Sequence, residues 1–503
     1  MSTGSRDLRE AAGGPLASRL SPRYLEEHCL IPLGVDPDGS LATAIGRPLD
    51  AGVEDELSRI FKRRLRLVDV PAGEVIAAIM SARRVVEAES VAPMSAPASS
   101  ENGELALDDL QALASQAPVI KLVNVLVLDA LRMGASDIHV ESLADGLRVR
   151  YRLDGVLQEV SQLADKYRAA VVSRIKIMAG LNIAERRLAQ DGRARLRLAD
   201  REVDLRVSTL PALHGESVML RILDHAGHGR GLGQLGMPPE IHQRFSTLIR
   251  RTSGIVLVTG PTGSGKTTTL YAALAEVNGP GVKIITVEDP VEYQIDGVIQ
   301  IPVNPKAGFT FDGALRSILR HDPDIIMVGE MRDRATAEIA IQVALTGHLV
   351  FSTLHTNDAA SAIARLVDMG IEPYLVAATV QGIVAQRLVR LLCDSCAEPY
   401  TPAPAELAGD AEADKRSAEY RRAKGCGECS GSGYSGRIAI YELLPVTDAY
   451  RSLISRSAPI DDIRKLARRD GTESLNAAGW RRVRSGATTI TELMRVVSQE
   501  EAS

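Results

Sequence analysis

The sequence is poor in aromatic side chains and has no excess of positive charge. Only 3% of its 503 residues are aromatic, and 59 Lys and Arg stand against 64 Asp and Glu, which gives a net charge of −5. A protein that binds nucleic acid offers positive charge to the phosphates and, for single strands, aromatic rings on which the bases stack. The composition therefore argues against a nucleic-acid-binding protein, although it leaves room for a local basic patch.

Long apolar segments are also scarce. The most apolar stretch, residues 119–133, contains Lys121, Asn124 and Asp129 and is shorter than the ~20 residues that cross a bilayer. The opening residues, MSTGSRDLREAAGGPL, lack the apolar run that follows a basic start in a secretory signal. We expect a cytoplasmic protein with no direct membrane span, whose membrane association depends on partner proteins.

Cysteine is rare, but its spacing is informative. Four of the five cysteines form two CxxC pairs, Cys393 with Cys396 and Cys426 with Cys429, separated by 29 residues. Four thiolates in two such pairs match the tetrahedral coordination of a structural Zn²⁺ and leave no open position for catalysis. We predict a structural zinc site, with a pair of redox dithiols and iron–sulfur ligation as the alternatives.

Local patterning divides the chain into a tail, two α+β domains and a larger α/β domain. From Gly254 onward, apolar strands alternate with helices, which indicates βαβ units and a parallel sheet. A Pro-, Ser- and Ala-rich segment before the second domain indicates a flexible linker. The predicted boundaries are a flexible tail at 1–20, an α+β domain at 21–90, a linker at 91–104, a second α+β domain at 105–230 and a third domain at 231–503, which includes the cysteine subdomain at 390–437.

The second domain is predicted to contain antiparallel hairpins. LRVRYRLDGVLQEV alternates apolar and polar residues around an Asp-Gly pair, and RARLRLADREVDLRVS alternates around an Ala-Asp pair. Arg148, Arg150 and Arg152 then share one face of a strand. This stripe is either a solvated sheet face or a surface that contacts an anion or a neighbouring subunit.

A phosphate-binding loop stands out in the third domain. The strand predicted at 255–259 leads directly into GPTGSGKT and then into a helix predicted at 268–277, the context of a Walker A motif. The backbone N–H groups of such a loop surround phosphate oxygens, Lys266 would reach the β and γ phosphates, and Thr267 would ligate Mg²⁺. The predicted ATP-binding residues are Gly260, Pro261, Thr262, Gly263, Ser264, Gly265, Lys266, Thr267 and Thr268.

Reactive side chains follow three other predicted strands of this domain. The strand at 283–287 leads to Glu288, the strand at 325–328 leads to Glu330, and a further strand ends at His355. Because ligands gather at the carboxyl ends of parallel strands, we expect these side chains to face the phosphate loop. Glu330 would hold Mg²⁺ through water and orient the attacking water, Glu288 is a candidate proton acceptor, and His355 is a candidate γ-phosphate contact. Which carboxylate is the base stays open.

These motifs resemble those of the type II secretion ATPases, members of the secretion superfamily of hexameric traffic ATPases. GPTGSGKT is similar to their Walker A motif, TVEDPVEY to their acidic Asp box, DIIMVGE to their Walker B motif and TGHLVFSTLHTND to their His box. GASDIHVE is similar to a signature of their second domain, and AQRLVRLLC with the four cysteines resembles their zinc subdomain. The resemblance covers most of the chain.

The resemblance implies an α/β fold: a RecA-like P-loop ATPase domain with preceding α+β domains, the second of them PAS-like, and a small zinc-binding subdomain. It also implies a homohexamer in which the second domain of one subunit closes over nucleotide held by the RecA-like domain. Two arginines from each domain would then approach the phosphates, and the pair in the RecA-like domain is four residues apart, as on one helix face. The matching positions are Arg206, Arg221, Arg316 and Arg320.

The implied function is that of a Mg²⁺-dependent ATPase, a protein-secreting translocase that drives pseudopilus assembly and protein export by a type II secretion system. Residues 21–90 would bind the cytoplasmic domain of an inner-membrane platform protein, which would place the protein peripherally at that membrane. A type IV pilus assembly ATPase is the nearest alternative. A DNA-translocating motor and a nucleotide-binding scaffold without turnover are alternatives from other classes.

Overall fold

Two compact units make up the chain. One comprises Met1–His225 with the cysteine segments Cys393–Ala397 and Ala423–Ser435, and the other comprises the remaining residues from Ala226 to Ser503. The predicted linker, 91–104, lies outside the described residues. The computed structural model describes residues 8, 11–12, 14–76, 78–79, 113–198, 201–223, 229, 231–304, 307–410 and 418–497.

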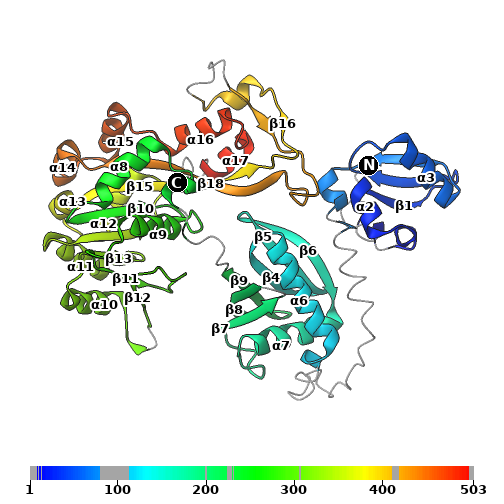
Figure 1. The fold of residues 1–503 in the computed structure, drawn as a ribbon, viewed down its shortest axis with the longest axis horizontal. Helices are drawn as coiled ribbons and strands as arrows, with labels where there is room; N and C mark the ends of the chain where they lie inside the picture. Colours follow the sequence, from blue (N-terminus) through cyan, green and yellow to red (C-terminus); the bar gives the residue numbers. More distant parts are fainter. Residues whose placement is uncertain are drawn as a thin grey trace. The chain divides into compact units, whose positions relative to one another are not determined.

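A three-stranded sheet with the order β1-β2-β3 organises the N-terminal domain (Figure 1). β1 and β2 pair antiparallel, whereas β2 and β3 pair parallel. The helix α3 and this sheet enclose a small apolar core. The elements are η1 (Ala17–Arg19), α2 (Pro22–His28), β1 (Leu30–Val35), β2 (Leu41–Ile45), α3 (Ala51–Phe61) and β3 (Leu65–Asp69).

Part of the segment that was expected to form a tail packs into this domain instead. Leu8, Ala12, Ala17 and Leu20 are at most 8% exposed and belong to the same apolar core as β1 and β2. The tail prediction for residues 1–20 is therefore wrong at these positions. Two of the four buried side chains are alanines, so the apolar periodicity is too weak to be recognised without the sheet that covers it.

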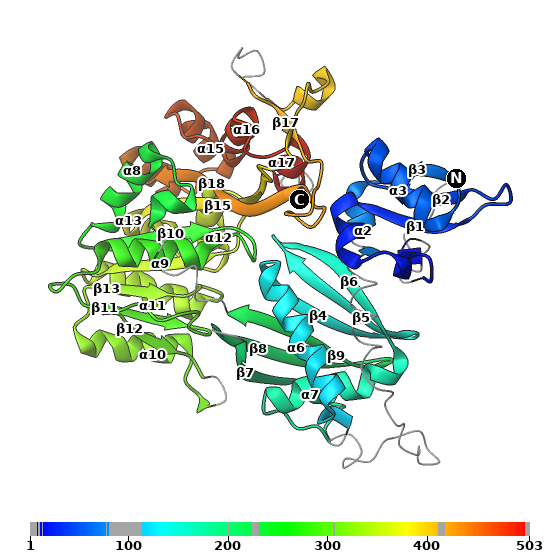
Figure 2. The same cartoon turned by 45° about the vertical axis from the view of Figure 1, so that its right-hand side comes forward.

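A six-stranded antiparallel sheet with the order β6-β5-β4-β9-β8-β7 organises the second domain. Both predicted hairpins are present, as β5–β6 and β7–β8. Figures 1 and 2 show α6 and α7 across one face of the sheet, where their apolar side chains are buried against it. The elements are α6 (Ala117–Arg132), β4 (Ala135–Leu143), β5 (Gly146–Leu153), β6 (Val156–Ala164), η2 (Asp165–Tyr167), α7 (Arg168–Met178), β7 (Gln190–Leu198), β8 (Arg201–Ala212) and β9 (Gly215–Leu223).

The opposite face of this sheet carries the arginine stripe of β5. Arg148 Nη2 lies 2.8 Å from a carboxylate oxygen of Glu141 on β4, and Arg150 pairs with the other oxygen. Because both cations have a partner on the neighbouring strand, the structure favours a solvated, ion-paired sheet face at these two positions.

A seven-stranded sheet with the order β12-β11-β13-β14-β10-β15-β18 organises the second unit. β10 pairs parallel with β14 and β15, and the strands on the far side of β14 continue the parallel arrangement. The predicted parallel α/β sheet is confirmed. The strands are β10 (Gly254–Thr259), β11 (Ile284–Glu288), β12 (Ile299–Pro302), β13 (Ile325–Val328), β14 (Leu349–Leu354), β15 (Val380–Leu392) and β18 (Tyr434–Pro445).

Helices cover both faces of this sheet (Figure 2). Ile255 and Leu257 join one apolar core with α10 to α17, whereas Val256 and Val258 join another with α8 and α9. A strand covered on both faces needs no polar alternation, which explains the sequence GIVLVT. The helices and remaining short elements are η4 (Leu232–Leu235), α8 (Pro239–Ile249), α9 (Lys266–Val277), α10 (Phe311–Ile318), η6 (Leu319–His321), α11 (Arg334–Leu345), α12 (Ala359–Asp368), α13 (Pro373–Thr379), β16 (Glu398–Pro399), η7 (Pro404–Leu407), β17 (Arg421–Arg422), α14 (Asp448–Ser455), α15 (Ile460–Arg469), α16 (Leu475–Arg484) and α17 (Ile490–Val497).

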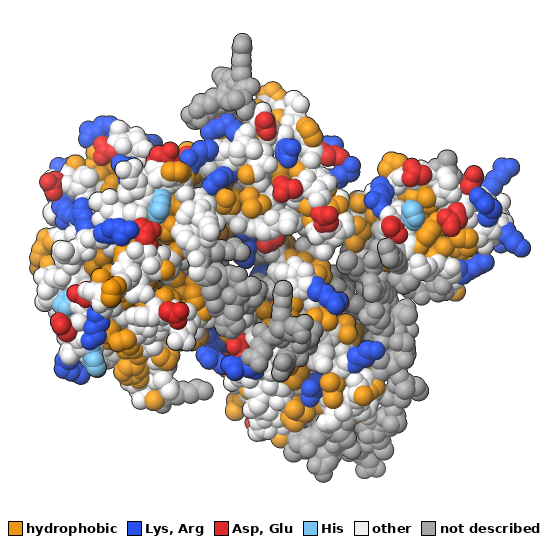
Figure 3. Space-filling model, in the orientation of Figure 1, with side chains coloured by type: hydrophobic (Ala, Val, Ile, Leu, Met, Phe, Trp, Pro, Cys, Tyr) orange, Lys and Arg blue, Asp and Glu red, His pale blue; other side chains and the backbone are white. Residues whose placement is uncertain are grey.

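The described surface mixes both signs of charge. Figure 3 shows Lys and Arg side chains beside Asp and Glu side chains across the face in view. Among the helices of the described residues, none has the length and apolarity needed to cross a bilayer.

Candidate functional site

The Gly-rich loop connects β10 to α9. β10 ends at Thr259, and α9 begins at Lys266. Gly263 and Gly265 have φ of +79° and +85°, a left-handed conformation that is costly for a residue with a Cβ. A Cβ at Gly265 would also lie 2.8 Å from Nε2 of Gln386. The two glycines therefore permit the tight backbone turns with which loops of this kind direct N–H groups at phosphate oxygens.

Lys266 folds back onto this loop. The residue is 9% exposed, and its Nζ donates hydrogen bonds to the carbonyl oxygens of Gly260 at 2.7 Å and Pro261 at 3.0 Å. Burial lowers the pKa of Lys266 to about 8, a shift that Glu330 opposes and Arg387 reinforces. A phosphate group bound in the loop would supply the negative charge that stabilises the ammonium form.

Two further observations fit the loop to a magnesium nucleotide. The hydroxyl of Ser264 is buried and has no hydrogen-bond partner within the described part of the chain. A buried polar group of this kind needs a partner, which a phosphate oxygen would provide. Thr267 is half-buried in the first turn of α9, where a hydroxyl ligates Mg²⁺ in phosphate-binding loops. The residues present fit ATP and Mg²⁺, although their ligand contacts stay a prediction.

Gln386, on β15, forms hydrogen bonds with the phosphate loop and with the first turn of α9. Its side chain is 2% exposed; Nε2 donates to the carbonyl oxygen of Ser264 at 2.7 Å, and Oε1 accepts from the Thr269 hydroxyl at 2.7 Å. In a trans peptide the C=O and the following N–H point in opposite directions. Anchoring the Ser264 carbonyl on β15 therefore directs the N–H of Gly265 away from β15, toward the inside of the loop.

Gln386→Leu is expected to raise the KM for ATP about tenfold while kcat at saturating ATP changes little, because an unpaired buried carbonyl costs ~1–3 kcal/mol. Steady-state phosphate release measures both constants. Gln381→Leu is the matched control, since Gln381 lies near the start of the same strand and its side-chain oxygen accepts from Arg451 at 2.9 Å. An unchanged KM in the Gln386 variant would contradict the anchoring role.

Lys266, Glu330 and His355 converge at one edge of the parallel sheet. The carboxylate of Glu330 is 16% exposed, pairs with Arg332, lies 3.6 Å from Nε2 of His355 and acts electrostatically on Lys266. Burial lowers the pKa of His355, and the Lys266 charge lowers it further, whereas Glu330 opposes the shift. His355 is therefore uncharged at pH 7 and can donate one hydrogen bond.

Glu288 ends β11, as predicted for a strand end, and is buried in a network of hydrogen bonds. It is 2% exposed, and its carboxylate accepts hydrogen bonds from the Tyr271 hydroxyl, from Thr286 Oγ1 at 2.5 Å and from Gln300 Nε2 at 3.1 Å. These three donors use most of the roughly four acceptor sites of the carboxylate, and they join the phosphate-loop helix to β11 and β12 through Glu288. A role for Glu288 as proton acceptor stays a prediction.

Arg316 and Arg320 do not share a regular helix. α10 ends at Ile318, and Arg320 lies in the 3-10 turn η6. Both arginines are exposed, and Arg320 Nη1 donates to the carbonyl oxygen of Arg316 at 3.1 Å. The α-helix passes directly into the 3-10 turn between the two positions, and the Arg320 side chain still contacts the backbone of Arg316. A role for either arginine at the phosphates stays a prediction.

Arg206 and Arg221 face each other in register on β8 and β9. Arg221 Nε donates to Asp137 Oδ1 at 2.8 Å, and Arg152 Nε lies 3.5 Å from the other oxygen of this carboxylate. Asp137 is 4% exposed, so the two cations offset the cost of burying its charge. The Arg221 side chain is still 48% exposed, which leaves it accessible to an anion.

The four paired cysteines form a compact cluster. Their sulfur atoms all lie within 4.8 Å of one another, with separations of 3.9 Å for Cys393 and Cys426, 3.8 Å for Cys396 and Cys429, and 3.7 Å for Cys426 and Cys429. Tetrahedral Zn–S bonds of about 2.3 Å place sulfur atoms about 3.8 Å apart. The backbone N–H of Gly433 also donates to Cys429 Sγ at 3.2 Å. The cluster fits the predicted Zn²⁺.

The predicted site residues did not include Arg332, Gln386 or Asp289, although Asp289 belongs to the acidic segment TVEDPVEY. Arg332 pairs with Glu330, and the charge of the exposed Asp289 acts on Arg332. Both follow strand ends, where spacing does not reveal the direction of a side chain. Gln386 did carry a signal, because a Gln-Arg pair follows the apolar run at 383–385 within β15 and buried polar groups need partners.

The chain is similar in sequence to known proteins. Residues 112–495 match the family model described as Type II/IV secretion system protein, and residues 7–86 match the MshEN domain. Type II secretion system protein E of Pseudomonas aeruginosa is 50% identical over 393 residues, which cover 78% of each chain. Its counterpart in Xanthomonas campestris is 46% identical over 496 residues, covering 96% of this chain and 85% of that one. The type IV pilus assembly ATPase PilB of Myxococcus xanthus is 47% identical over 392 residues, which cover 77% of this chain and 69% of that one.

Solved structures share the fold. The pilus retraction motor PilT with bound ADP is 26% identical with a TM-score of 0.50, covering 74% of this chain and 96% of that one. The ATPase DotB of Yersinia pseudotuberculosis is 20% identical with a TM-score of 0.57, and the match covers 81% of this chain and 99% of that one. These likenesses confirm the RecA-like α/β fold. Together with the family model and the relatives, they show that the chain belongs to the Type II/IV secretion system protein family, as a secretion ATPase.

Proposed function

We propose that this protein is a Mg²⁺-dependent ATPase that powers pseudopilus assembly and protein export by a type II secretion system. The observation that carries the proposal is the convergence of Lys266, Glu330 and His355 beside the phosphate loop. It occurs in a chain that is 46–50% identical to type II secretion proteins from two organisms. The geometry supports turnover as well as binding, because a carboxylate and a hydrogen-bond donor lie next to the lysine.

Each of these side chains has a distinct task in the proposed reaction. Lys266 exchanges its contacts with Gly260 and Pro261 for the β and γ phosphates, and Glu330 orients the attacking water. Neutral His355 donates a hydrogen bond to a γ-phosphate oxygen. Mg²⁺, when bound, would neutralise part of the negative charge on the phosphates.

We also propose a homohexamer in which Arg206 and Arg221 of one subunit act on nucleotide held by the next. The support is the polar sheet face on which both arginines lie in register, with Arg221 held by Asp137 yet accessible. Arg316 and Arg320 are exposed and would contact the phosphates of the same nucleotide. Because an arginine finger contributes about 10³–10⁵ in rate, hydrolysis would depend on assembly.

The N-terminal domain is proposed to select the membrane partner. Residues 21–90 would bind the cytoplasmic domain of an inner-membrane secretion platform protein and so hold the ATPase peripherally at the membrane. The separate MshEN match over residues 7–86 supports a separate role for this part of the chain. Type IV pilus assembly is the second candidate, because the pilus ATPase of Myxococcus xanthus is 47% identical.

Affinity capture from detergent-solubilised membranes of the native cell tests this assignment. The immobilised full-length chain is expected to retain a secretion platform protein, identified by mass spectrometry, whereas a chain lacking residues 1–90 is not. Capture of pilus-base proteins would transfer the same chemistry to pilus assembly. Equal capture by both chains would contradict the role of residues 21–90.

A further inference from the structure

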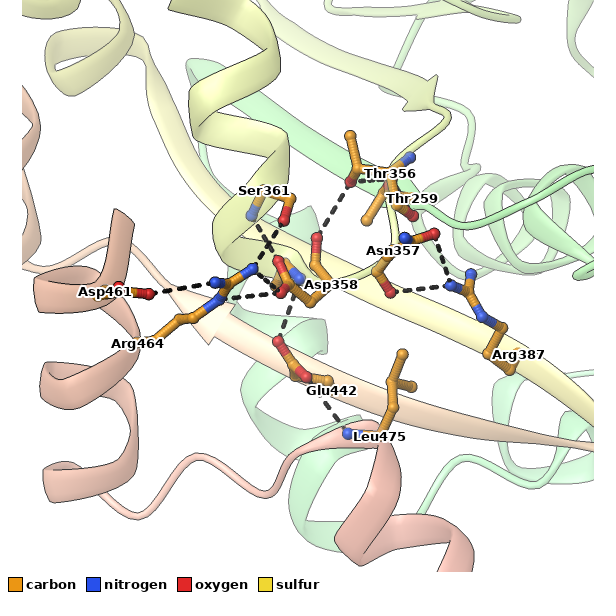
Figure 4. A network of polar contacts seen from close by, with 11 residues as sticks. Thr259, Thr356, Asn357, Asp358, Ser361, Arg387, Glu442, Asp461, Arg464 and Leu475 are labelled. Carbon is orange, nitrogen blue, oxygen red and sulfur yellow. Dashed lines mark hydrogen bonds and ion pairs between the residues drawn. The ribbon is translucent and has the colours of Figure 1, made fainter. Parts of the chain in front are cut away.

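Residues from four separate elements form hydrogen bonds with the short loop that begins at His355 or with the residue that follows this loop. The loop, residues 355–358, connects the end of β14 to the start of α12. At its centre, Thr356 Oγ1 lies 2.7 Å from Thr259 Oγ1 at the end of β10, and its backbone N–H donates to the same hydroxyl at 3.0 Å. Arg387 of β15 donates to the carbonyl oxygen of Asn357 at 3.1 Å (Figure 4). The loop is therefore attached directly to the strands beside the phosphate site.

The third attachment comes from the C-terminal helices. Asp358 caps α12, because its Oδ1 accepts from the backbone N–H of Ser361 at 2.6 Å. Its Oδ2 accepts from Arg464 Nη2 at 2.7 Å and from Nε at 3.1 Å. Figure 4 shows Arg464 reaching from α15 to this carboxylate, across 106 residues of sequence. A charge-assisted contact made through two nitrogens fixes direction as well as distance.

The fourth attachment is Glu442 of β18. One of its carboxylate oxygens accepts from the backbone N–H of Ala359 at 3.1 Å, and the other accepts from that of Leu475 at 3.2 Å. These N–H groups begin α12 and α16, so one carboxylate joins the first residues of two helices, whose N–H groups have no partner within their own helix. The start of α12 is thus held from β18 and from α15 at once.

We infer that Arg464 is a positioning residue for ATP hydrolysis, acting through Asp358 to hold His355 beside Glu330. The inference rests on the proposed function. His355 lies three residues before Asp358, and the loop between them has little slack because Thr356 and Asn357 are also attached. Loss of the Arg464 contact removes the charged attachment at Asp358, and we expect the resulting shift to reach His355 three residues away. A displacement of about 1 Å in an active site costs up to about 10²-fold in rate.

Arg464→Met tests the inference, with Lys465→Met as its matched control. Lys465 is the next residue on α15, its side chain is 72% exposed, and within the described residues its ion pair is a local one, with Asp462 at 3.2 Å. Arg464→Met is expected to lower kcat by about tenfold with KM for ATP nearly unchanged, because His355 is assigned to the transition state. Lys465→Met is expected to match the parent chain. An unchanged kcat in Arg464→Met would overturn the inference.

A second variant and a double-mutant cycle separate positioning from general destabilisation. Asp358→Asn retains an oxygen that can cap α12 but loses the charge that binds Arg464, so it should reproduce the fall in kcat. In a His355→Ala background, Arg464→Met should cause no further loss. An additive loss there would show that Arg464 acts independently of His355 and would overturn the inference. Absence of hydrolysis in the parent chain would instead refute the proposed function.

Discussion

Lys266→Ala is expected to lower the kcat for ATP hydrolysis by roughly 10²–10³-fold, because the γ-phosphate then loses its main positive charge in a partly buried site. It should also weaken nucleotide binding, since Lys266 is the phosphate loop's own cation. Phosphate release and equilibrium binding of a fluorescent ADP analogue measure the two effects. Lys121→Ala, an exposed lysine of α6, is the control and should change neither. Full turnover by the Lys266 variant would refute the assignment of the site.

Glu330→Gln should separate binding from turnover at the same site. The amide is nearly isosteric but cannot hold Mg²⁺ or orient water as a carboxylate does, so hydrolysis is expected to fall by a similar factor while ADP still binds. The substitution also removes the charge that pairs with Arg332 and acts on Lys266. If the variant hydrolyses ATP normally, Glu330 is not the catalytic carboxylate, and Asp289 would be tested next.

The pH dependence of ATP binding follows from the same lysine. Burial lowers the pKa of Lys266 to about 8, so the nucleotide-free protein carries this charge below that pH and loses it above. Bound phosphate favours the charged form, which means that binding takes up a proton at high pH and weakens there. The KM for ATP should therefore rise as pH increases through about 8, and a KM that stays flat across this range would contradict the assignment.

Removing the metal is expected to unfold the cysteine subdomain. Structural zinc contributes an apparent ~10–16 kcal/mol of folding free energy in small peptides. Between β15 and β18, the described residues offer only the two-residue strands β16 and β17 as a sheet. Cys426→Ser combined with Cys429→Ser should abolish zinc binding and make residues 393–429 susceptible to protease, which metal analysis and limited proteolysis would show.

Cys29→Ala is the matched control for the metal site. Cys29 is the cysteine outside the cluster and is buried in the N-terminal domain, so this variant should retain about one zinc per chain. A parent chain purified without a chelator that contains no zinc, yet resists protease between β15 and β18, would favour the redox dithiol alternative. Iron and sulfide in the same analysis would favour the iron–sulfur alternative.

Local features of the chain were predictable because neighbouring residues create them. The Gly-rich loop, the turn within LRVRYRLDGVLQEV and the apolar strand at 325–328 each depend on backbone preferences over a few residues. The ends of the parallel strands were also predictable, since their carboxyl ends meet at one edge. Glu330 and His355 therefore fall where the sequence placed them, close to Lys266.

The sequence alone was thus enough to recognise the family motifs, the phosphate loop and the cysteine pairs, because each is encoded within a short segment. Only the tertiary structure decided which neighbour each strand-end side chain contacts. Glu288 accepts hydrogen bonds from Tyr271 and Gln300. Gln386 supports a loop more than 100 residues earlier, and Arg464 reaches Asp358 across 106 residues. The physical reason is that a strand or helix pattern specifies one face of an element, whereas hydrogen-bond partners depend on which distant elements pack against that face.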